Sequence, residues 1–187
     1  MGQVIGFVGW PCAGKDVAAG YLQRVYGARR FGHSDTIRKL AAEQGNMSPT
    51  TQHLSAVFEA QAAVNGYGWI ARKVRNAIEH LWLEKPDALV VISGVRNLAE
   101  VEIYREIEGF LLVKIEADFK VRLARARRLQ EMGEKGLTRS RFQGIEQLPG
   151  NANIPDLMKI DGPTISNNGE KLAPFHSQLD QLVVKRD

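Results

Sequence analysis

The chain has 187 residues and a formal net charge of +4, with 44% hydrophobic and 25% charged residues. This composition is typical of folded globular proteins and excludes disordered and fibrous ones, and the length suits a single domain over residues 1–187. The sequence has no apolar run long enough for a membrane span and no signal-peptide pattern, so we expect a cytoplasmic protein. Its only cysteine, Cys12, excludes an internal disulfide.

The basic residues gather in two places, RVYGARR and KVRLARARR, and do not form one long run. A site for small anionic substrates is the simpler interpretation of this pattern. A nucleic-acid partner is the weaker alternative, and it depends only on the basic isoelectric point.

The first half of the chain alternates apolar runs with helical patterns. The run VIGFVGW predicts a buried strand, and helical periodicity follows from Lys15 to Tyr26. A short strand in ARRFGHS precedes a helix from Thr36 to Gln44. The segment from Thr50 to Glu84 has no strand pattern and places apolar residues on one helical face, which predicts a helical insertion.

The second half continues this alternation. The runs ALVVIS and FLLVKIEA predict buried strands, separated by a helix from Leu98 to Ile107. A helix beginning at Phe119 leads into QEMGEKGLTRSRF, which lacks core periodicity and contains two glycines, so we expect a mobile flap there. A short strand in PTISNNG and a closing helix complete an α/β fold with a parallel sheet covered on both faces.

The stretch GWPCAGKD contains the frame Gly9-x-x-x-x-Gly14-Lys15 of a phosphate-binding loop, between a predicted strand and a predicted helix. In this context the backbone N–H groups and the helix N-terminus converge on phosphate oxygens, and Lys15 supplies positive charge to the terminal phosphates. We predict that the residues binding the phosphates of ATP are Gly9, Cys12, Ala13, Gly14, Lys15, Asp16 and Val17.

Asp16 stands where phosphate loops normally carry a Ser or Thr hydroxyl that meets magnesium. A carboxylate is a good ligand for this hard cation. The strand ALVVIS ends in Ser93, where the usual acid of such folds would lie. We therefore predict that Asp16 and Ser93 have exchanged roles around Mg²⁺; the alternative is that Asp16 only stabilises the N-terminus of its helix.

Two arginines follow predicted strands. Asp35 lies at a strand-to-helix junction with Arg38 one helical turn further on, and Arg96 follows the strand that ends in Ser93. Open parallel sheets bind ligands at this edge. Either arginine alone could form a surface salt bridge, but the two together beside a phosphate loop favour an acceptor site.

These motifs, in this order over nearly the whole chain, resemble the nucleoside monophosphate kinase group of P-loop kinases. The similar segments are GWPCAGKD, SDTIRKL, SGVRNLAEVE, LLVKIEADFKVRLARARR and IPDLMKIDGPTISNNG. Within this adenylate-kinase-like group, the chain is similar to kinases described as dephospho-coenzyme-A-kinase-like. The GKD variant also occurs in phage-type deoxynucleoside monophosphate kinases.

The resemblance implies a P-loop NTPase fold: a five-stranded parallel sheet in the order 2-3-1-4-5, flanked by helices. It implies an acceptor-binding helical region over 35–85, a basic lid over 128–142, and the use of ATP and Mg²⁺. Two departures are that Ser93 replaces the family's usual Asp and that the lid lacks a clean arginine pair.

The resemblance also implies roles for single residues. The predicted catalytic residues are Lys15, Arg96, Arg125 and Arg128. The predicted acceptor-binding residues are Asp35, Arg38 and Arg96. The predicted lid residues are Arg139 and Arg141, and those near the donor base are Asn167 and Asn168, for which a plain tight turn is the alternative.

The predicted reaction is ATP-dependent phosphorylation of a nucleoside or deoxynucleoside monophosphate to the diphosphate, with small-molecule nucleotides as partners. The nearest alternative is phosphorylation of dephospho-coenzyme A. Two alternatives of other classes are a nucleotide-binding sensor with little turnover, suggested by Ser93, and a kinase directed at nucleic acid.

Overall fold

The computed structural model describes residues 2–129 and 136–183 and is built around one parallel sheet. In these residues the strand order is β2-β3-β1-β4-β5, and every neighbouring pair is parallel. The strands are β1 (Val4–Val8), β2 (Arg29–Gly32), β3 (Val90–Ser93), β4 (Phe110–Glu116) and β5 (Thr164–Ser166). The predicted fold class and the order 2-3-1-4-5 are therefore confirmed.

The central strand β1 explains why its sequence is apolar without interruption. It pairs with β3 on one side and β4 on the other, so that Gly6 lies opposite both Ile92 and Leu112. Every residue of β1 is buried. Because both faces of a parallel sheet are covered, neither set of alternating side chains needs to be polar.

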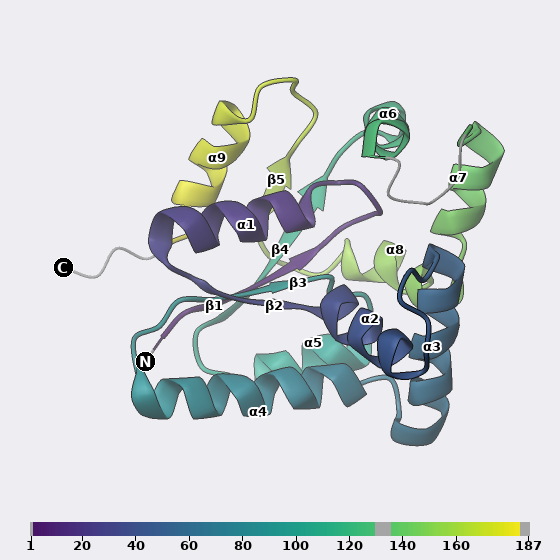
Figure 1. Ribbon diagram of the computed structural model, residues 1–187. Coiled ribbons are helices and arrows are strands. Elements are labelled where there is room, and N and C mark those ends of the chain that lie inside the picture. The colour runs from purple at the N-terminus through teal and green to yellow at the C-terminus, as the bar shows by residue number, and fades with distance from the viewer. Residues whose placement is uncertain (1, 130–135, 184–187) are drawn as a thin grey trace.

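Helices cover both faces of the sheet (Figure 1). One face packs against α1 (Lys15–Tyr26) and α9 (Ala173–Asp180), in a core that includes Ile5 and Phe7 from β1. The other face packs against α4 (Trp69–Glu84) and α5 (Leu98–Arg105), in a core that includes Val4 and Val8. Alternate residues of one strand thus build two separate cores.

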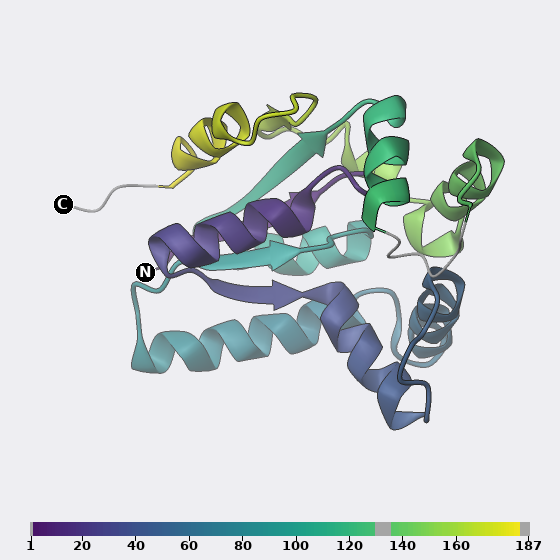
Figure 2. The ribbon, with the colours of Figure 1, turned by 45° about the horizontal axis from the view of Figure 1, so that its top comes forward.

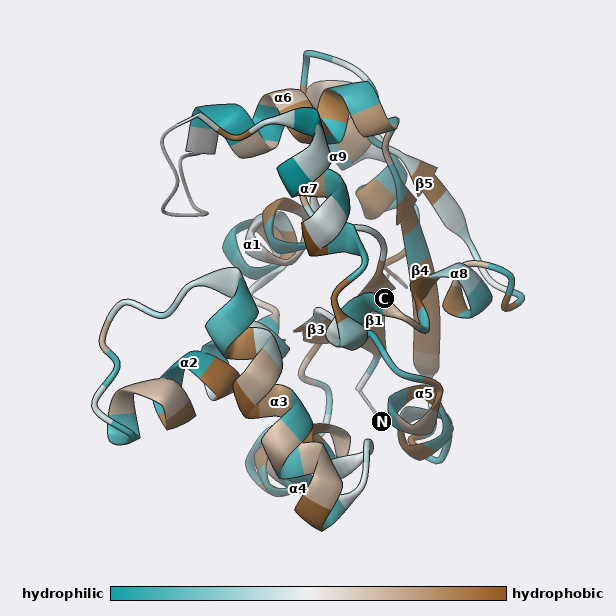
Figure 3. Cartoon of the chain, turned by 90° about the vertical axis from the view of Figure 1, so that its right-hand side faces the viewer, coloured by the Kyte–Doolittle hydropathy of each residue, from teal (hydrophilic) through white to brown (hydrophobic). Residues whose placement is uncertain are grey.

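The remaining helices stand beyond the carboxyl ends of the strands, where the arrowheads point in Figure 2. They are α2 (His33–Glu43), α3 (Thr51–Asn65), α6 (Phe119–Leu129) and α7 (Arg139–Glu146), with a 3-10 turn η1 (Pro149–Asn151). The short helix α8 (Ile154–Leu157) instead adds Leu157 to the core that contains Val4 and Val8. Viewed from that side, α2, α3, α6 and α7 form an amphipathic rim, teal and brown, around the ends of the strands (Figure 3). The predicted helical insertion is thus two helices: α4 covers the sheet, and α3 belongs to the rim.

The segment predicted to be a flap contains a helix in its described part. Residues 130–135 of the predicted lid lie outside the described residues. Beyond them, α7 begins after Thr138, whose hydroxyl accepts a hydrogen bond from the N–H of Arg141 at 3.2 Å. Phe142 is fully buried against Leu123 and Ala126 of α6. One aromatic anchor on an eight-residue helix gives no repeating pattern, which is why the sequence does not reveal this element.

Two aliphatic residues of α4, Ile78 and Leu83, allow a test of how this helix packs against the sheet. Ile78 is fully buried, whereas Leu83 on the same helix is 83% exposed. We expect Ile78→Ala to lower the free energy of unfolding by about 2–5 kcal/mol, because it leaves a cavity in the core. Leu83→Ala, the matched control, should change it by less than about 0.5 kcal/mol. Urea unfolding of both variants measures the difference, and equal effects would contradict this packing.

Candidate active site

The loop between β1 and α1 has the backbone of a tight anion-binding turn. Gly9, Cys12 and Gly14 have φ angles of 154°, 60° and 115°. A Cβ on Gly9 would lie 2.4 Å from the carbonyl oxygen of Ile115, and a Cβ on Gly14 would lie 2.2 Å from Nδ2 of Asn167. Only glycine fits these two places. In the described chain no side chain caps α1 at Gly14, so its first N–H groups are left for a ligand or water.

Lys15, the first residue of α1, folds back over this loop. Its Nζ donates hydrogen bonds to the carbonyl oxygens of Gly9 at 2.6 Å and Trp10 at 2.9 Å, and the residue is 7% exposed. Burial lowers the pKa of the Lys15 ammonium from 10.5 to about 7, with repulsion from Arg96 as the next cause. The two bonded partners are neutral carbonyls, and the Asp16 carboxylate, which is not bonded to Lys15, raises the pKa of this ammonium by less than burial lowers it.

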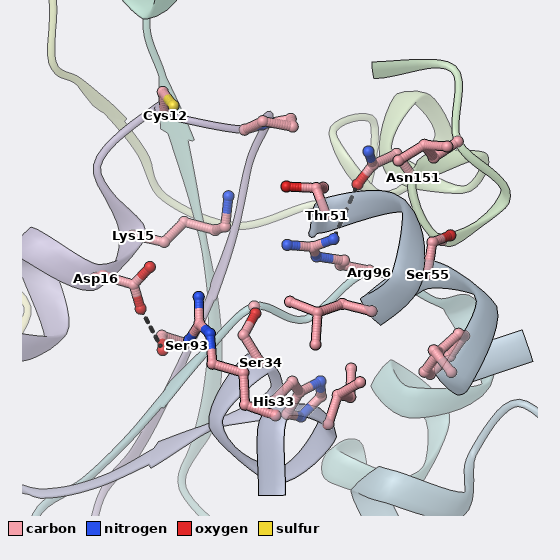
Figure 4. A pocket seen from close by; sticks show the side chains of 18 of the residues that line it. Cys12, Lys15, Asp16, His33, Ser34, Thr51, Ser55, Ser93, Arg96 and Asn151 are labelled. Atoms are coloured by element: carbon pink, nitrogen blue, oxygen red, sulfur yellow. Dashed lines mark hydrogen bonds between the residues drawn. The ribbon is translucent and has the colours of Figure 1, made fainter. Parts of the chain in front are cut away.

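Arg96 enters the same pocket from the end of β3. Its backbone N–H donates to Oε2 of Glu100 at 2.8 Å, and the same oxygen accepts from the N–H of Asn97 at 3.2 Å. This is the capping box at the start of α5, and it fixes the chain on which Arg96 stands. Nη1 of Arg96 donates to Oδ1 of Asn151 at 3.2 Å (Figure 4). Burial lowers the pKa of the Arg96 guanidinium below its usual value.

Lys15 and Arg96 therefore form a pair of inward-facing cations. Over residues 2–129 and 136–183, no carboxylate lies within salt-bridge distance of either side chain. Buried charges are normally paired because desolvation is costly. Two unpaired cations at one pocket are an arrangement that favours an anionic ligand.

Asp16 and Ser93 are in direct contact, as Figure 4 shows. The Ser93 hydroxyl donates to Oδ1 of Asp16 at 2.9 Å, and Nη2 of Arg30 donates to the same oxygen at 2.9 Å. The Asp16 side chain is 72% exposed. The sequence pairs Asp16 with Ser93 but gives no role to Arg30, which appears only as one residue of a basic segment.

Asp35 and Arg38 lie at the rim of the pocket. Oδ1 of Asp35 pairs with Nη1 of Arg38 at 3.1 Å, and its Oδ2 lies 3.6 Å from Nη2 of Arg30. Arg30 thus stands between Asp16 of α1 and Asp35 of α2. The Asp35 and Arg38 side chains are more than half exposed, so their ion pair is weak and readily exchanged for another partner.

Arg125 of α6 contacts the outside of the phosphate loop. Its Nη2 donates to the carbonyl oxygen of Asn167 at 2.7 Å, and its Nη1 lies 3.4 Å from the carbonyl oxygens of Cys12 and Ala13. Nδ2 of Asn167 donates to the carbonyl oxygen of Ala13 at 2.7 Å. Arg125 and Asn167 therefore join the loop to the segment after β5, and their predicted roles toward the transferred phosphoryl group and the donor base stay predictions.

The other residues predicted on this side are more peripheral. Asn168 accepts a hydrogen bond from the N–H of Asp118 at 2.6 Å, at the start of α6. Arg128 is exposed near the end of α6. The Arg139 guanidinium lies 5.3 Å from the ring centre of Phe119, and Arg141 is exposed on α7. Val17 is 45% exposed on α1.

Arg122 is a further basic residue of this region that the sequence does not single out. It is 6% exposed, pairs with Glu146 of α7, and donates to the carbonyl oxygen of Ala117 at 2.8 Å. Its guanidinium also lies 5.7 Å from the ring centre of Trp10 in the phosphate loop. Arg122 therefore joins α6 to both α7 and the loop.

The pocket between the two cations and α3 has a cavity volume of about 160 Å³. This is roughly ten times the room that one water needs, so the pocket suits a small molecule. One part is apolar, and hydroxyl groups lie beside it; the apolar residues are Ile37, Leu54, Phe58 and Leu148. Ser34, Thr51 and Ser55 supply the hydroxyls. Oγ of Ser55 is buried without a hydrogen-bond partner among the described residues.

A buried polar network supports one side of the pocket. Nε2 of His33 lies 2.6 Å from the hydroxyl of Tyr104, and its Nδ1 lies 3.4 Å from Oε1 of Glu100. All three residues are at most 3% exposed. No motif in the sequence points to His33, because the partners that bury it come from α5.

The donor atoms around Asp16 suit magnesium. Asp16 and Ser93 offer a carboxylate and a hydroxyl, and both are oxygen ligands of the kind this cation prefers. Within the described ranges no group of three or more His, Cys, Asp or Glu residues could hold a metal ion. A magnesium ion here would therefore need further ligands, and phosphate oxygens of a nucleotide commonly supply them. None of the described helices is long and apolar enough to cross a membrane.

The strand order and the glycine-containing loop before α1 define a P-loop kinase-like fold. Solved structures show the same fold. Shikimate kinase from Acinetobacter baumannii, in complex with shikimate, has a TM-score of 0.59 at 16% identity, covering 97% of this chain and 92% of that chain. A gluconokinase from Sinorhizobium meliloti 1021 has a TM-score of 0.51 at 13% identity, covering 97% and 90%.

Similar sequences are UPF0200 proteins of archaea. The UPF0200/UPF0201 protein of Archaeoglobus fulgidus is 26% identical over 185 residues, which are 98% of this chain and 55% of that protein. A UPF0200 protein of Methanosarcina mazei is 32% identical over 130 residues, 68% of this chain and 66% of that protein. The chain thus spans about half the length of the first relative. No protein-family model matches it.

The lowered pKa of Lys15 gives a test of nucleotide binding. Near pH 8 the buried amine is mostly neutral in the free protein, since its pKa is about 7. Phosphate oxygens next to it favour the charged form and raise the pKa, so binding should take up about one proton per site. Calorimetric titration with Mg·ATP at pH 8 in Tris and in HEPES measures this uptake, because the two buffers have different ionisation enthalpies.

The control is Lys15→Arg, in which the side chain stays charged at this pH. Its binding enthalpy should be the same in both buffers. If the wild-type enthalpy is also independent of the buffer, Lys15 does not change its protonation when nucleotide binds.

Proposed function

We propose that this protein transfers a phosphoryl group from ATP to a nucleoside or deoxynucleoside monophosphate, giving the diphosphate. The observation that carries the proposal is that Lys15 and Arg96 line one pocket and that, within the described part of the chain, neither forms an ion pair with a carboxylate. Lys15 comes from the phosphate loop and Arg96 from the end of β3, so they suit phosphates of two different molecules. The charges of a donor and an acceptor phosphate would compensate both cations.

In this proposal the loop and Lys15 bind the donor phosphates, and Arg96 with Arg38 binds the acceptor phosphate. Asp16 and Ser93 would hold Mg²⁺, which neutralises charge on the phosphates. The protein contributes position and charge, because phosphoryl transfer needs little covalent chemistry from side chains. Arg125, Arg128, Arg139 and Arg141 are the proposed basic residues around the transferred group, and Asn167 and Asn168 the proposed neighbours of the donor base.

The apolar part of the pocket supports a nucleotide as the acceptor. Leu54 and Phe58 of α3 offer surface for a flat, weakly polar group such as a base, beside the arginines for its phosphate. A polyhydroxylated acceptor, by contrast, needs many polar partners. The shikimate kinase and gluconokinase folds therefore support kinase chemistry here, but their acceptors fit this pocket less well.

The nearest rival is phosphorylation of dephospho-coenzyme A, which would use the same donor loop. A sensor that binds nucleotide with little turnover and a kinase acting on nucleic acid are further alternatives. Coupled turnover with ATP separates these functions when the acceptor is varied over nucleoside and deoxynucleoside monophosphates, dephospho-coenzyme A, shikimate, gluconate and oligonucleotides. Turnover of dephospho-coenzyme A alone would overturn the proposal, and nucleotide binding without any turnover would favour the sensor.

The two proposed acceptor arginines should affect acceptor use and leave ATP use nearly unchanged. Each makes a charge-assisted contact worth roughly 1.5–3 kcal/mol, so Arg38→Ala or Arg96→Ala should lower kcat/KM for the acceptor about 10-fold or more. Lys39→Ala is the control for Arg38, because Lys39 is its exposed neighbour on α2. Steady-state kinetics with each substrate varied measures the effects. Wild-type acceptor kinetics in both arginine variants would place the acceptor elsewhere.

The contact between Asp16 and Ser93 allows a test of the proposed metal ligands. Asp16→Asn should require more magnesium for turnover, because a neutral amide is a weaker ligand for this cation. Since the two side chains are 2.9 Å apart, Asp16→Ser combined with Ser93→Asp returns a carboxylate to nearly the same place. The double variant should be more active than Asp16→Ser alone.

Turnover as a function of magnesium concentration, for wild type, each single variant and the double variant, measures this. An unchanged magnesium requirement in Asp16→Asn would reject a ligand role for Asp16. A double variant no better than the worse single variant would reject the exchange of roles.

A further inference from the structure

Asn151 is the partner that the structure gives to the Arg96 side chain, and no sequence motif points to it. It ends the turn η1 and is 2% exposed. Its Oδ1 accepts from Nη1 of Arg96 at 3.2 Å, and its Nδ2 donates to the carbonyl oxygen of Ile145 at 2.8 Å. The amide therefore lies between the last turn of α7 and the guanidinium, as Figure 4 shows for its Arg96 side.

These two hydrogen bonds fix which way the amide faces. The carbonyl oxygen of Ile145 can only accept, so the NH₂ group must point toward it. The amide oxygen is then directed at Arg96, whose guanidinium can only donate. A carboxylate of the same shape could not satisfy both neighbours, because it would set an oxygen against the Ile145 carbonyl.

The amide also leaves the charge of Arg96 uncompensated. A carboxylate at this position would form a buried ion pair with the guanidinium and would compete with any anionic ligand. Glu100, a buried acid beside Arg96, directs one oxygen to the backbone N–H groups of Arg96 and Asn97 and the other toward His33. Both the backbone and the side chain of Arg96 are thus fixed, and Glu100 favours the charged guanidinium without forming an ion pair with it among the described residues.

We infer that Asn151 is a positioning residue that orients Arg96 while leaving its positive charge available to a phosphate group of the acceptor. The inference deepens the proposed function and rests on it for the identity of the acceptor. It also explains why this residue is an asparagine: the amide oxygen accepts a hydrogen bond from the guanidinium but carries no negative charge. Because the amide is bonded to Ile145, the orientation of Arg96 also depends on the position of α7.

The sharpest variant is Asn151→Asp, because it keeps the shape and changes the charge. Its affinity for inorganic phosphate should fall about 10-fold or more, since the new carboxylate occupies Arg96. Asn151→Ala removes the orienting bond but not the charge, so its affinity should fall less, about two- to tenfold. Asn153→Asp is the charge-matched control, two residues away and without a side-chain cap on α8.

Phosphate is titrated against the full chain by thermal shift, with a non-hydrolysable ATP analogue and Mg²⁺ present to occupy the phosphate loop. Each variant is repeated in an Arg96→Ala background. If Asn151 acts through Arg96, the Asp substitution should have no further effect there. Turnover should show the same split: the acceptor KM rises in Asn151→Asp, while the KM for ATP stays within about twofold of wild type.

Three results would overturn the inference: wild-type phosphate affinity in Asn151→Asp, an equal loss in Asn153→Asp, or a loss that persists without Arg96. If Asn151→Asp does not fold, the phosphate affinity of Asn151→Ala is compared with and without Arg96→Ala. A loss of affinity that persists without Arg96 would again overturn the inference. The phosphate titration stands apart from the acceptor panel. Failure of every nucleotide as an acceptor would reject the proposed function, while the order of phosphate affinities would still test Asn151.

Discussion

The arrangement of the pocket depends on the cost of withdrawing positive charge from water: Lys15 is buried, Arg96 is half-buried, and both line the pocket. They approach from different elements, and in the described chain neither forms an ion pair with a carboxylate. Burying such charges is unfavourable, and burial is the main cause that lowers the pKa of both side chains, with repulsion from Arg96 second for Lys15. The fold maintains this arrangement because the surrounding elements are fixed by the two large cores on either side of the sheet. An anion bound beside the two cations would offset the cost of burying them, and this electrostatic gain would favour binding of any small anion.

The groups that accept hydrogen bonds from these two cations are neutral carbonyl and amide oxygens. Lys15 is bonded to the carbonyl oxygens of Gly9 and Trp10, and Arg96 to the amide oxygen of Asn151. Each bond orients a charged side chain, yet leaves the charge for a ligand. The one buried acid nearby, Glu100, is used to fix backbone N–H groups. Position and charge are therefore controlled by separate contacts, which suits catalysis by preorganised electrostatics.

The sequence predicts the parts of this site that depend on local pattern. The phosphate loop follows from two glycines and a lysine between a strand and a helix, and the contact of Asp16 with Ser93 follows from the adjacency of β1 and β3. Asn151, Arg30 and Arg122 could not be found in the same way. Each acquires its neighbours through tertiary packing: Asn151 meets Arg96 across 55 residues, and Arg122 meets Glu146 across 24. An amide in an irregular turn carries no periodic signal, and an arginine within a basic run cannot be distinguished from a solvated one.

The exposed ion pairs at the rim complete the electrostatics of Asp16. Arg30 lies between Asp16 and Asp35, and Asp35 in turn pairs with Arg38. Asp16 adds a negative charge next to a site that suits phosphates, and Arg30 provides its counter-charge. The Asp35–Arg38 pair is exposed on both sides and is worth at most about 1 kcal/mol, so a ligand can replace it at little cost. The carboxylate in the phosphate loop therefore already has a counter-charge from the chain, in Arg30.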